Sequence, residues 1–590
     1  RCLETDPGQR PPSVYAVLAA LPGGDPLAAA LAAGETPSPE LVANARDAGG
    51  LKPAIALGLS AVVVAALAIV YLVHSGTMVM PGRSPTVLSV IAGQTMEELG
   101  YDELPGNTNA GYFLNARALD EGGPPFRYWR RWSSGVFEPV HLHAPEVFAL
   151  DGRTFGEAED AGESATVAID PAGRLMKLLV TPGLAREHAS SGSADWTPLF
   201  RRAGLDPAGA TEIPPPALPP VHCEELVAWR IEGRGENEYP VVLMGAVGGR
   251  PNYFDYVGLD RAFVPVGQLQ RFVTTTAAGP LPAVARAVLL LMLVLAIRNL
   301  RAGRGDRRNA VRCGLVVGGL YALMEALALT IGGLTGFKAF GEFSGVRMGH
   351  ALIHGAEAWV IYMAVEPYVR RVWPRMLIGL VRLLGGRWRD PSVGREVLIG
   401  TAIGCALSAL LALLVWIPAA GSGSGSDTAA QLPFGADLWS MVSPLHFGSL
   451  KGHRMAWTVI DALFLAGLLV AIRLVVRNGW ATAMLGAAVL IVMVYRWGFL
   501  DYGDYPLWAK AIFALVSGTT VFLLYTRVGI LASIVTVFVT QPYTVLAAGF
   551  GAWYSPYVVA ELAIPLALGA YGLSASLAGR SILASVLAEP

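Results

Sequence analysis

A group of ionisable residues lies inside apolar stretches of this sequence, where a charged side chain is costly to bury. His350, His354 and Glu357 follow one another at spacings of four and three residues, which places them on one face of a helix. Glu325 lies midway along the preceding apolar stretch and could meet them across a helix pair. Two imidazoles and a carboxylate are ligands that a transition metal accepts. Hydrogen bonding among the same groups is the commoner role, so we predict structural pairing and keep a metal site as the alternative.

Asp461 and Glu561 are two further carboxylates within later apolar stretches. Each is a candidate for function by default, because an ionisable group in lipid raises the free energy of the folded chain. They are suited to line a transport path, although hydrogen bonding between helices is the commoner use of such residues. Glu366 lies near the end of its apolar stretch, and Arg370 follows four residues later, a spacing that predicts a local ion pair.

The elements that must hold these groups are membrane helices, as the composition indicates. The chain has 590 residues, 53% of them hydrophobic and 15% charged, and its mean hydropathy is +0.48. Soluble domains carry about 25% charged residues. The net charge of -1 gives no indication of nucleic-acid binding.

A membrane span needs about 20 apolar residues. The sequence predicts an α-helical polytopic protein with about ten membrane-spanning helices: 51–74, 280–299, 311–333, 346–367, 397–418, 455–476, 480–497, 508–526, 528–548 and 556–578.

The distribution of arginine predicts how these spans are oriented. Arginines are concentrated in the loops 298–312 and 368–396, and loops rich in Lys and Arg stay in the cytoplasm. This places the N-terminus in the cytoplasm, residues 75–278 outside it, and the C-terminus in the cytoplasm for an even number of spans. In the second loop, apolar residues recur at helical spacing between 373 and 384, which predicts a helix lying on the inner membrane surface or, alternatively, a solvated loop.

Residues 75–278 are predicted to form an extracytoplasmic α+β domain. A helix ending at Gly100, a strand at 127–132 and a hairpin at 166–180 are followed, in the same order, by a second helix, strand and hairpin ending at 257. This order predicts a duplicated α-β-β-β module. Only one of the four cysteines, Cys223, falls in this domain, so no disulfide framework is expected. Aromatic residues of the domain could line a ligand cleft, although they more often form the core of such sheets: Tyr128, Trp129, Trp132, Trp196, Trp229, Tyr253 and Phe254.

The first residues of the chain carry a recognisable motif, Cys2-Leu3-Glu4-Thr5-Asp6-Pro7-Gly8-Gln9-Arg10-Pro11-Pro12-Ser13. It resembles the end of a protein kinase C-lobe, whose pattern is C-L-x-x-D-P-x-x-R-P. By that resemblance, Arg10 is the buried arginine that pairs with the Glu closing the activation segment, and Asp6 belongs to the same structural motif. A generic turn that opens a helix is the alternative. Further segments are similar to bacterial serine/threonine kinases with a membrane-embedded C-terminal half: 20–27, 33–38, 298–308, 366–374 and 389–395.

The resemblance implies that this chain is the membrane and sensor portion of such a kinase, located in the bacterial cytoplasmic (inner) membrane. An extracytoplasmic domain would then regulate ATP-dependent protein phosphorylation inside the cell. The Gly-rich loop, the Lys–Glu pair, the catalytic Asp and the metal-binding Asp of a kinase are not in this sequence and are expected upstream, where ATP and Mg²⁺ would bind. No catalytic residue and no cofactor is therefore assigned to the chain itself. The expected partners are the lipid bilayer, the kinase domain, its protein substrates and a second copy of the chain in a homodimer, with no nucleic acid.

The motif and the predicted spans together divide the chain into five parts. They are the end of a kinase C-lobe (1–22), a cytoplasmic juxtamembrane linker (23–50), the first span (51–74), the extracytoplasmic domain (75–278) and a bundle of about nine helices (279–590). Two other functions fit parts of the same pattern. One is a transporter or channel with a path past the intramembrane carboxylates, and the other is an intramembrane metalloenzyme that uses the His350 group.

Overall fold

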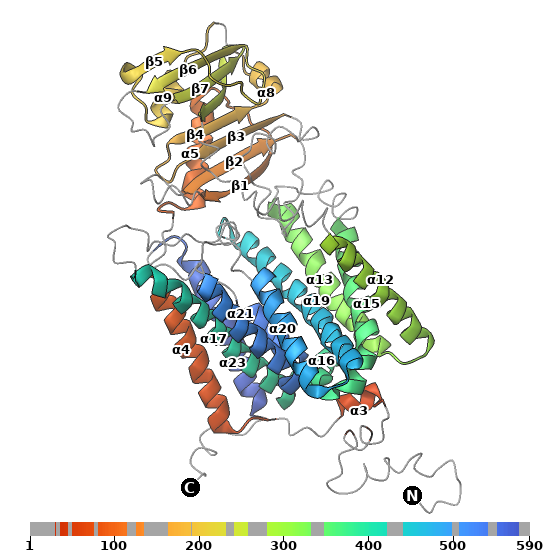
Figure 1. Cartoon of the computed structure of the whole chain (residues 1–590). Helices are drawn as coiled ribbons and strands as arrows, with labels where there is room; N and C mark the ends of the chain where they lie inside the picture. The colour runs from red at the N-terminus through yellow and green to blue at the C-terminus, as the bar shows by residue number, and fades with distance from the viewer. Residues whose placement is uncertain are drawn as a thin grey trace, which may run out of the picture.

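The chain folds into an antiparallel sheet domain that lies at one end of a helical bundle (Figure 1). The computed structural model describes residues 27, 30, 36–44, 50–75, 81–114, 126–134, 163–189, 192–231, 241–257, 280–331, 347–421, 441–497, 507–540 and 552–577. We call the end of the bundle next to the sheet domain the sheet end. The opposite end, which carries the arginine-rich loops 301–307 and 371–390, is called the basic end.

The sheet domain has two halves that repeat the same order of elements, here called copies, and each copy has four strands and not the three that we predicted. The order of the eight strands is β1-β2-β3-β4-β8-β7-β6-β5, so the copies meet at the β4–β8 pair, where Leu178 lies opposite Phe254. The missed strands are β1, which begins with the polar run Asn-Thr-Asn, and β5, which has four residues. Neither shows clear alternation of apolar and polar residues. The first copy consists of α5 (Pro85–Glu98), β1 (Asn107–Leu114), β2 (Phe126–Ser133), β3 (Ser164–Ile169) and β4 (Leu175–Val180), and the second of α9 (Thr197–Ala203), β5 (Ala210–Ile213), β6 (Glu225–Ile231), β7 (Val241–Val247) and β8 (Arg250–Tyr256), with α8 (Pro182–Glu187) between them.

Each copy sends an arginine to the C-terminal end of the other copy's helix. Helix α5 is followed by Gly100 with φ +84°, and α9 by Gly204 with φ +65°, so both helices end in the left-handed conformation that glycine allows. A Cβ on Gly100 would lie 1.9 Å from Arg250 Nη1, and a Cβ on Gly204 would lie 3.1 Å from Arg174 Cδ. At Gly100 the guanidinium itself lies near the end of the helix, where the negative end of the dipole favours a cation. At Gly204 the contact is the aliphatic stem of Arg174, whose guanidinium pairs with Asp170. The reciprocal contacts therefore hold the two copies together.

Gly100→Ala is expected to destabilise the sheet domain by about 1–3 kcal/mol. The new methyl group would occupy the position of the Arg250 guanidinium and would also force a side chain into a positive φ. Gly209→Ala is the matched control, because a Cβ at Gly209 meets nothing within 4 Å. Hydrogen exchange of residues 81–257 in the purified full chain measures the effect. Equal protection in the two variants would contradict this account of the helix ends.

The aromatic residues of the sheet domain form its core. Tyr128, Trp129, Trp132, Tyr253 and Phe254 are all at most 5% exposed, which confirms a structural role for these five rings. Cys223 is a free thiol, and burial raises its pKa to about 11, while its Sγ donates a hydrogen bond to Asn252 Oδ1 at 3.3 Å. The thiol therefore stays protonated at neutral pH and is a poor nucleophile.

The bundle contains six helices long and apolar enough to cross a membrane, among the residues described. A polytopic membrane fold is therefore supported, whereas the count of ten spans is not confirmed. The other helices are shorter or, like α15, carry several ionisable residues. The six are α4 (Pro53–Ser75), α13 (Arg307–Ile331), α17 (Pro391–Gly421), α19 (Pro444–Val476), α21 (Leu507–Leu523) and α23 (Ser555–Ser576), and the others in the bundle are α12 (Pro280–Arg301), α15 (Met348–Val372), α16 (Ile378–Leu384), α20 (Gly479–Trp497) and α22 (Ile530–Val539).

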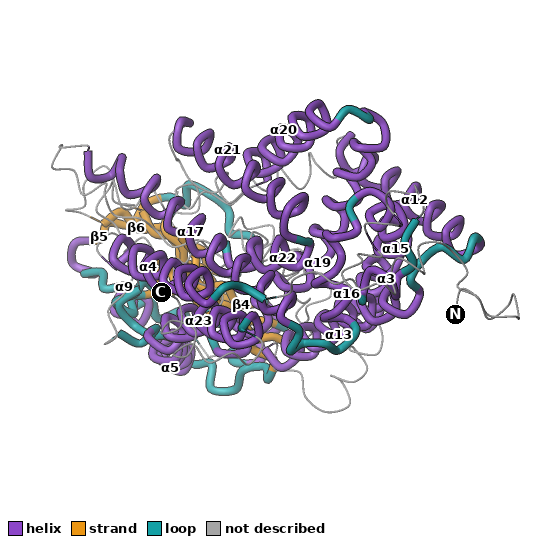
Figure 2. Tube along the Cα trace, turned by 90° about the horizontal axis from the view of Figure 1, so that it is seen from below, coloured by secondary structure: helices purple, strands orange, loops and turns teal. Residues whose placement is uncertain are grey.

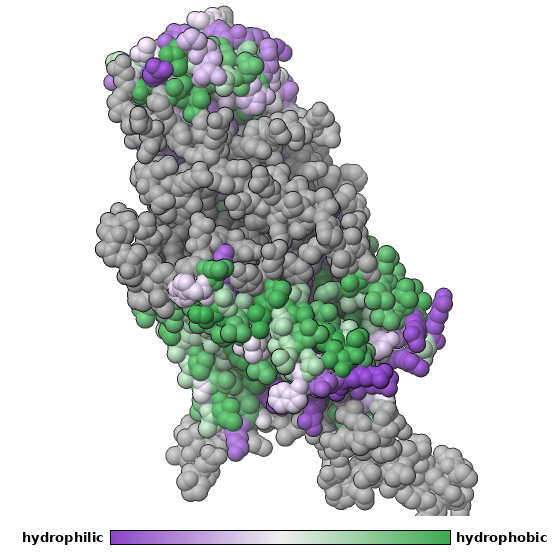
Figure 3. Space-filling model, in the orientation of Figure 1, coloured by the Kyte–Doolittle hydropathy of each residue, from purple (hydrophilic) through white to green (hydrophobic). Residues whose placement is uncertain are grey.

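The surface of the bundle matches a membrane setting. Hydrophobic residues cover much of its visible face, and hydrophilic residues gather at the basic end (Figure 3). The predicted helix between 373 and 384 is present as the 3₁₀ turn η5 (Pro374–Leu377) followed by α16. Its Leu377 and Leu380 are 2% and 4% exposed, so this segment packs against the bundle.

Two groups of helices make up the bundle when it is viewed from the basic end (Figure 2). In one group, α17 packs against α4, α22 and α23; in the other, α15 packs against α12, α13 and α19. The α13–α15 crossing is close because it is built on glycine. A Cβ at Gly314 would lie 2.8 Å from the Gly355 carbonyl oxygen, and a Cβ at Gly355 would lie 3.2 Å from the Gly318 Cα. Small residues at such crossings let two backbones approach closely.

Candidate functional site

A cluster of polar and aromatic side chains lies where α13, α15 and α19 meet, in the half of the bundle nearer the sheet end. The Tyr321 ring stacks on the His354 ring with centroids 4.1 Å apart. His453 packs edge-on against Tyr321, and Trp457 packs edge-on against His354. Carboxylates lie close to this stack: Glu357 Oε2 is 3.1 Å from His354 Nδ1, and Asp461 follows Trp457 by one turn of α19. We call the set the membrane cluster: Tyr321, Glu325, Arg347, His350, His354, Glu357, His453, Trp457 and Asp461.

The structure brings Glu325 to His350, as the sequence suggested. Glu325 Oε1 lies 3.3 Å from His350 Nδ1, and its other oxygen accepts a hydrogen bond from Arg347 Nη1 at 3.0 Å. His354 Nδ1 lies 3.1 Å from Glu357 Oε2 on the same helix. Within the described part of the chain, no three His, Cys, Asp or Glu side chains are grouped so that they could hold a metal ion. The geometry is that of paired hydrogen bonds.

The two remaining intramembrane carboxylates have different surroundings. Glu561 is not isolated, because Lys451 on α19 lies 2.5 Å from its Oε1 and ties α19 to α23. Asp461 lies halfway along α19, is exposed, and has no hydrogen-bond or ion-pair partner among the described residues. Its charge interacts with that of Glu357.

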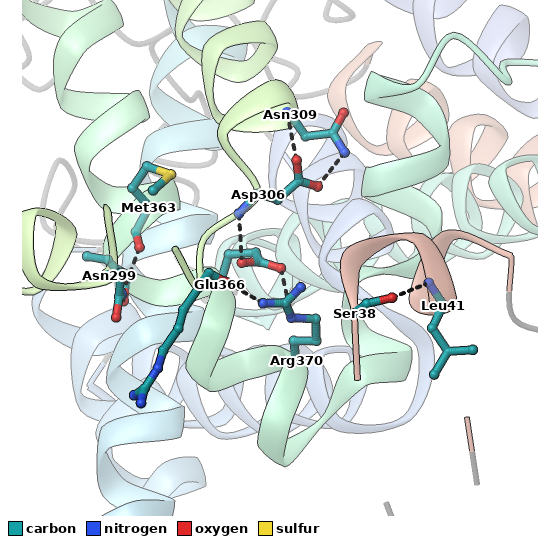
Figure 4. A network of polar contacts seen from close by, with 10 residues as sticks. Ser38, Leu41, Asn299, Asp306, Asn309, Met363, Glu366 and Arg370 are labelled. Atoms are coloured by element: carbon teal, nitrogen blue, oxygen red, sulfur yellow. Dashed lines mark hydrogen bonds and ion pairs between the residues drawn. The ribbon is translucent and has the colours of Figure 1, made fainter. Parts of the chain in front are cut away.

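A second polar network occupies the basic end of the bundle (Figure 4). The predicted Glu366–Arg370 ion pair is confirmed, with Arg370 Nε 3.3 Å from Glu366 Oε1 and both residues 3% exposed. Arg370 Nη2 also donates to the Arg304 carbonyl at 2.5 Å, and the Asp306 amide donates to Glu366 Oε2 at 3.4 Å. The buried pair therefore fixes the loop between α12 and α13 to α15.

A proline in α15 creates a further contact in this network. Pro367 has no N–H group, so the Met363 carbonyl four residues earlier lacks its helical partner. Asn299 Nδ2 from α12 donates to that carbonyl at 2.9 Å and to the Ala364 carbonyl at 3.2 Å. The hydrogen bond compensates for the missing backbone donor and joins α12 to α15.

The segment before the first span is docked on the same end of the bundle. Helix α3 (Pro39–Ala43) is capped by the Ser38 hydroxyl and contacts η5 and α16. Val42 is 1% exposed and belongs to the same apolar cluster as Leu377 and Leu380. Two guanidinium nitrogens of Arg387 donate to Asn44 Oδ1 at 3.1 Å. Figure 4 shows this segment beside the Arg370 pair.

The loop that supplies Arg387 has its own bracing. Arg382 Nη1 donates to Asp390 Oδ1 at 3.0 Å and to the Ser392 hydroxyl at 2.7 Å. Burial opposes ionisation of Asp390, but hydrogen bonds from Ser392 and the charge of Arg382 outweigh it and lower the pKa of that carboxyl. Asp390 is therefore ionised at neutral pH and holds the loop on which the linker docks.

The sheet domain contacts the bundle through aromatic residues at the start of α23. Trp553 Nε1 donates to the Pro81 carbonyl at 2.8 Å, and the Trp553 ring stacks on Tyr112 with centroids 6.5 Å apart. The Tyr112 hydroxyl in turn donates to the Arg83 carbonyl at 3.2 Å. Apolar residues of both parts form one continuous core.

Several of these residues were not singled out in the sequence. Asn299, Trp553 and Tyr112 make contacts with residues 64 to 472 positions away, which no local spacing reveals. A proline within an apolar run, at Pro367, is the one available sign that a carbonyl would need an outside donor. Asp6 and Arg10, which carry the kinase resemblance, lie outside the described residues.

Comparisons with known proteins identify no relative. No family model matches the chain, and neither a curated protein nor a solved structure does so.

Proposed function

We propose that this chain is the membrane and sensor portion of a transmembrane serine/threonine kinase of the bacterial inner membrane, with ten spans and the basic end in the cytoplasm. The sequence support is the motif at residues 2–13 and the arginine distribution. The structural observation that favours it is the docking of residues 36–44, which would connect a kinase to the first span. This segment is held by the same bundle that contacts the sheet domain at its other end.

One helix contacts both ends of the proposed signalling path. Helix α23 has 22 residues, a length of about 33 Å. Trp553 precedes its start and bonds the sheet domain, while near its end the Tyr571 hydroxyl donates to the Trp388 carbonyl. A Cβ at Gly50, just before the first span, would lie 2.7 Å from the Ser576 carbonyl oxygen. A ligand that shifts the sheet domain between two states would therefore bias the linker through α23, in addition to the covalent connections through α4 and α12.

Two other functions remain as alternatives. A transporter or channel is favoured by Asp461, an exposed carboxylate halfway along a membrane helix. An intramembrane metalloenzyme gains no support from the arrangement of the His350 group within the described residues. Sequencing the coding region upstream of the codon for Arg1 is the experiment that decides between these ideas. The kinase is supported if that region encodes a Gly-rich loop, a strand Lys, an H-R-D-type loop and a D-F-G motif. If these motifs are absent, a transporter or channel becomes the favoured function.

Val42→Asp in the full-length protein is expected to release the linker and to abolish the response of autophosphorylation to stimulus. The reason is that a carboxylate in place of the buried valine would weaken docking of the linker by about 2–5 kcal/mol, because the apolar contact leaves the charge unsolvated. Thr36→Asp adds the same charge at an exposed position of the same segment and is the matched control. Phosphate incorporation in proteoliposomes is the measurement. A normal response in Val42→Asp would show that linker docking plays no part in signalling.

A further inference from the structure

The membrane cluster contains a polar group that its protein neighbours leave unsatisfied. Tyr321 is 2% exposed, and its hydroxyl has no hydrogen-bond partner among the residues described. An unsatisfied buried hydroxyl costs about 1–3 kcal/mol. Such a group persists when something other than the protein completes its hydrogen bonding.

The charges around this hydroxyl define what would complete it. Glu357 lies beside the stack, because its Oε2 is 3.1 Å from Nδ1 of His354, whose ring stacks on Tyr321. Asp461 lies one turn of α19 after Trp457, which packs on the same imidazole. Glu325 is already paired with Arg347 and His350, so its charge is compensated. Among the described residues, Glu357 has a hydrogen bond from His354 and no lysine or arginine in contact, and Asp461 has no partner. The Tyr321 ring therefore lies close to two carboxylates, of which Glu357 is bonded to one imidazole and Asp461 has no described partner.

The cluster is not fully enclosed by the protein. Asp461 is exposed, and the Glu357 side chain is 21% exposed, although both lie on helices within the bundle. A carboxylate on a membrane helix faces the bundle interior or a water-filled recess far more often than it faces lipid. A small hydrated ion could therefore reach the pair.

We propose that the membrane cluster binds a monovalent cation, a proton or Na⁺, between the Glu357 and Asp461 carboxylates, with the Tyr321 hydroxyl as a neutral ligand. Carboxylate and hydroxyl oxygens suit a small hard cation, and one positive charge offsets the repulsion between two carboxylates in a low dielectric. This site is independent of the kinase assignment. The other ionisable groups that face it are Glu325 on α13, Arg347, His350 and His354 on α15, His453 on α19, and Tyr525, whose hydroxyl donates to the Ala462 carbonyl.

The proposed site is tested with dicyclohexylcarbodiimide, a membrane-permeant reagent that modifies protonated carboxyl groups. The full chain in lipid nanodiscs is treated from mildly acidic to mildly alkaline pH, with NaCl or choline chloride at equal ionic strength, and peptide mass spectrometry locates the adducts. We expect modification of Asp461 or Glu357 that decreases as the pH rises. Protection by Na⁺ but not choline identifies a Na⁺ site, and pH dependence without protection identifies a proton site.

Tyr321→Phe tests the assignment of the hydroxyl, because phenylalanine keeps the ring stack on His354. We expect it to raise the Na⁺ concentration for half-protection about tenfold or, for a proton site, to move the labelling profile about one unit to lower pH, because loss of a ligand weakens binding of either cation. Tyr362→Phe is the matched control, since Tyr362 is also buried with no hydroxyl partner among the residues described, but lies beside Glu366. Absence of labelling at both carboxylates, labelling independent of pH and Na⁺, or identical behaviour of Tyr321→Phe and the wild type would each overturn the proposal.

Discussion

Gly314→Leu is expected to prevent α13 and α15 from packing together and to reduce strongly the yield of folded protein in the membrane. A Cβ at this position would lie 2.8 Å from the Gly355 carbonyl oxygen and 3.2 Å from the Trp359 Cβ. The first obstacle is backbone, which cannot move away by changing a rotamer. The three further carbons of leucine add to the clash, so we expect a loss of roughly 3 kcal/mol or more.

The same helix provides a matched control for this substitution. Gly319 lies five residues further along α13, and a Cβ there meets nothing within 4 Å. Gly319→Leu therefore adds the same apolar volume to the same helix without a clash. The yield of monodisperse protein and its thermal unfolding in detergent measure both variants. If Gly319→Leu lost as much folded protein as Gly314→Leu, helix propensity or insertion would be responsible instead of the crossing.

The glycine crossing also positions the membrane cluster. Tyr321 lies one turn after Gly318, and His354 directly precedes Gly355, so close approach of the two backbones places the two rings in contact. Gly314→Ala, with a single added methyl group, is expected to give an intermediate loss of stability. The geometry of the polar site thus depends on residues that carry no polar side chain.

The sequence predicted those features that depend on neighbouring residues. Helical stretches, the hairpin at 166–180 and the glycine at which α5 ends all follow from local patterns, and the structure contains each of them. The Glu366–Arg370 pair was predictable because its partners are one helical turn apart. The number of spans was not predictable from the sequence. An apolar run alone does not show whether a helix such as α22, with 10 residues, reaches across a membrane.

Contacts between distant segments could not be predicted in this way. Lys451 and Glu561 belong to helices far apart in the chain, and either residue alone reads as an isolated charge. The position of α3 is equally nonlocal, since Val42 finds its apolar neighbours more than 300 residues away. A single sequence contains no record of which helix faces meet, because many pairings of apolar faces have similar burial.

Glu366→Leu is expected to destabilise the bundle by about 3–5 kcal/mol. It would leave the Arg370 guanidinium, 3% exposed, without its carboxylate in an interior where an unpaired charge is costly. It would also remove the acceptor for the Asp306 amide and loosen the loop between α12 and α13. Because this network lies beside the docked linker, we expect residues 36–44 to become more sensitive to protease in the same variant (Figure 4).

The double variant Glu366→Leu/Arg370→Met is the decisive control. Replacing both members of a buried ion pair by apolar residues of similar size is often neutral or stabilising, since no charge is left unpaired. Thermal unfolding in nanodiscs of the wild type, both single variants and the double variant forms a complete cycle, from which the coupling between the two residues follows. We expect the double variant to recover most of the stability that each single variant loses. A double variant as unstable as the sum of the two single losses would mean that Glu366 and Arg370 stabilise the bundle separately, through Asp306 and Arg304, and not as a pair.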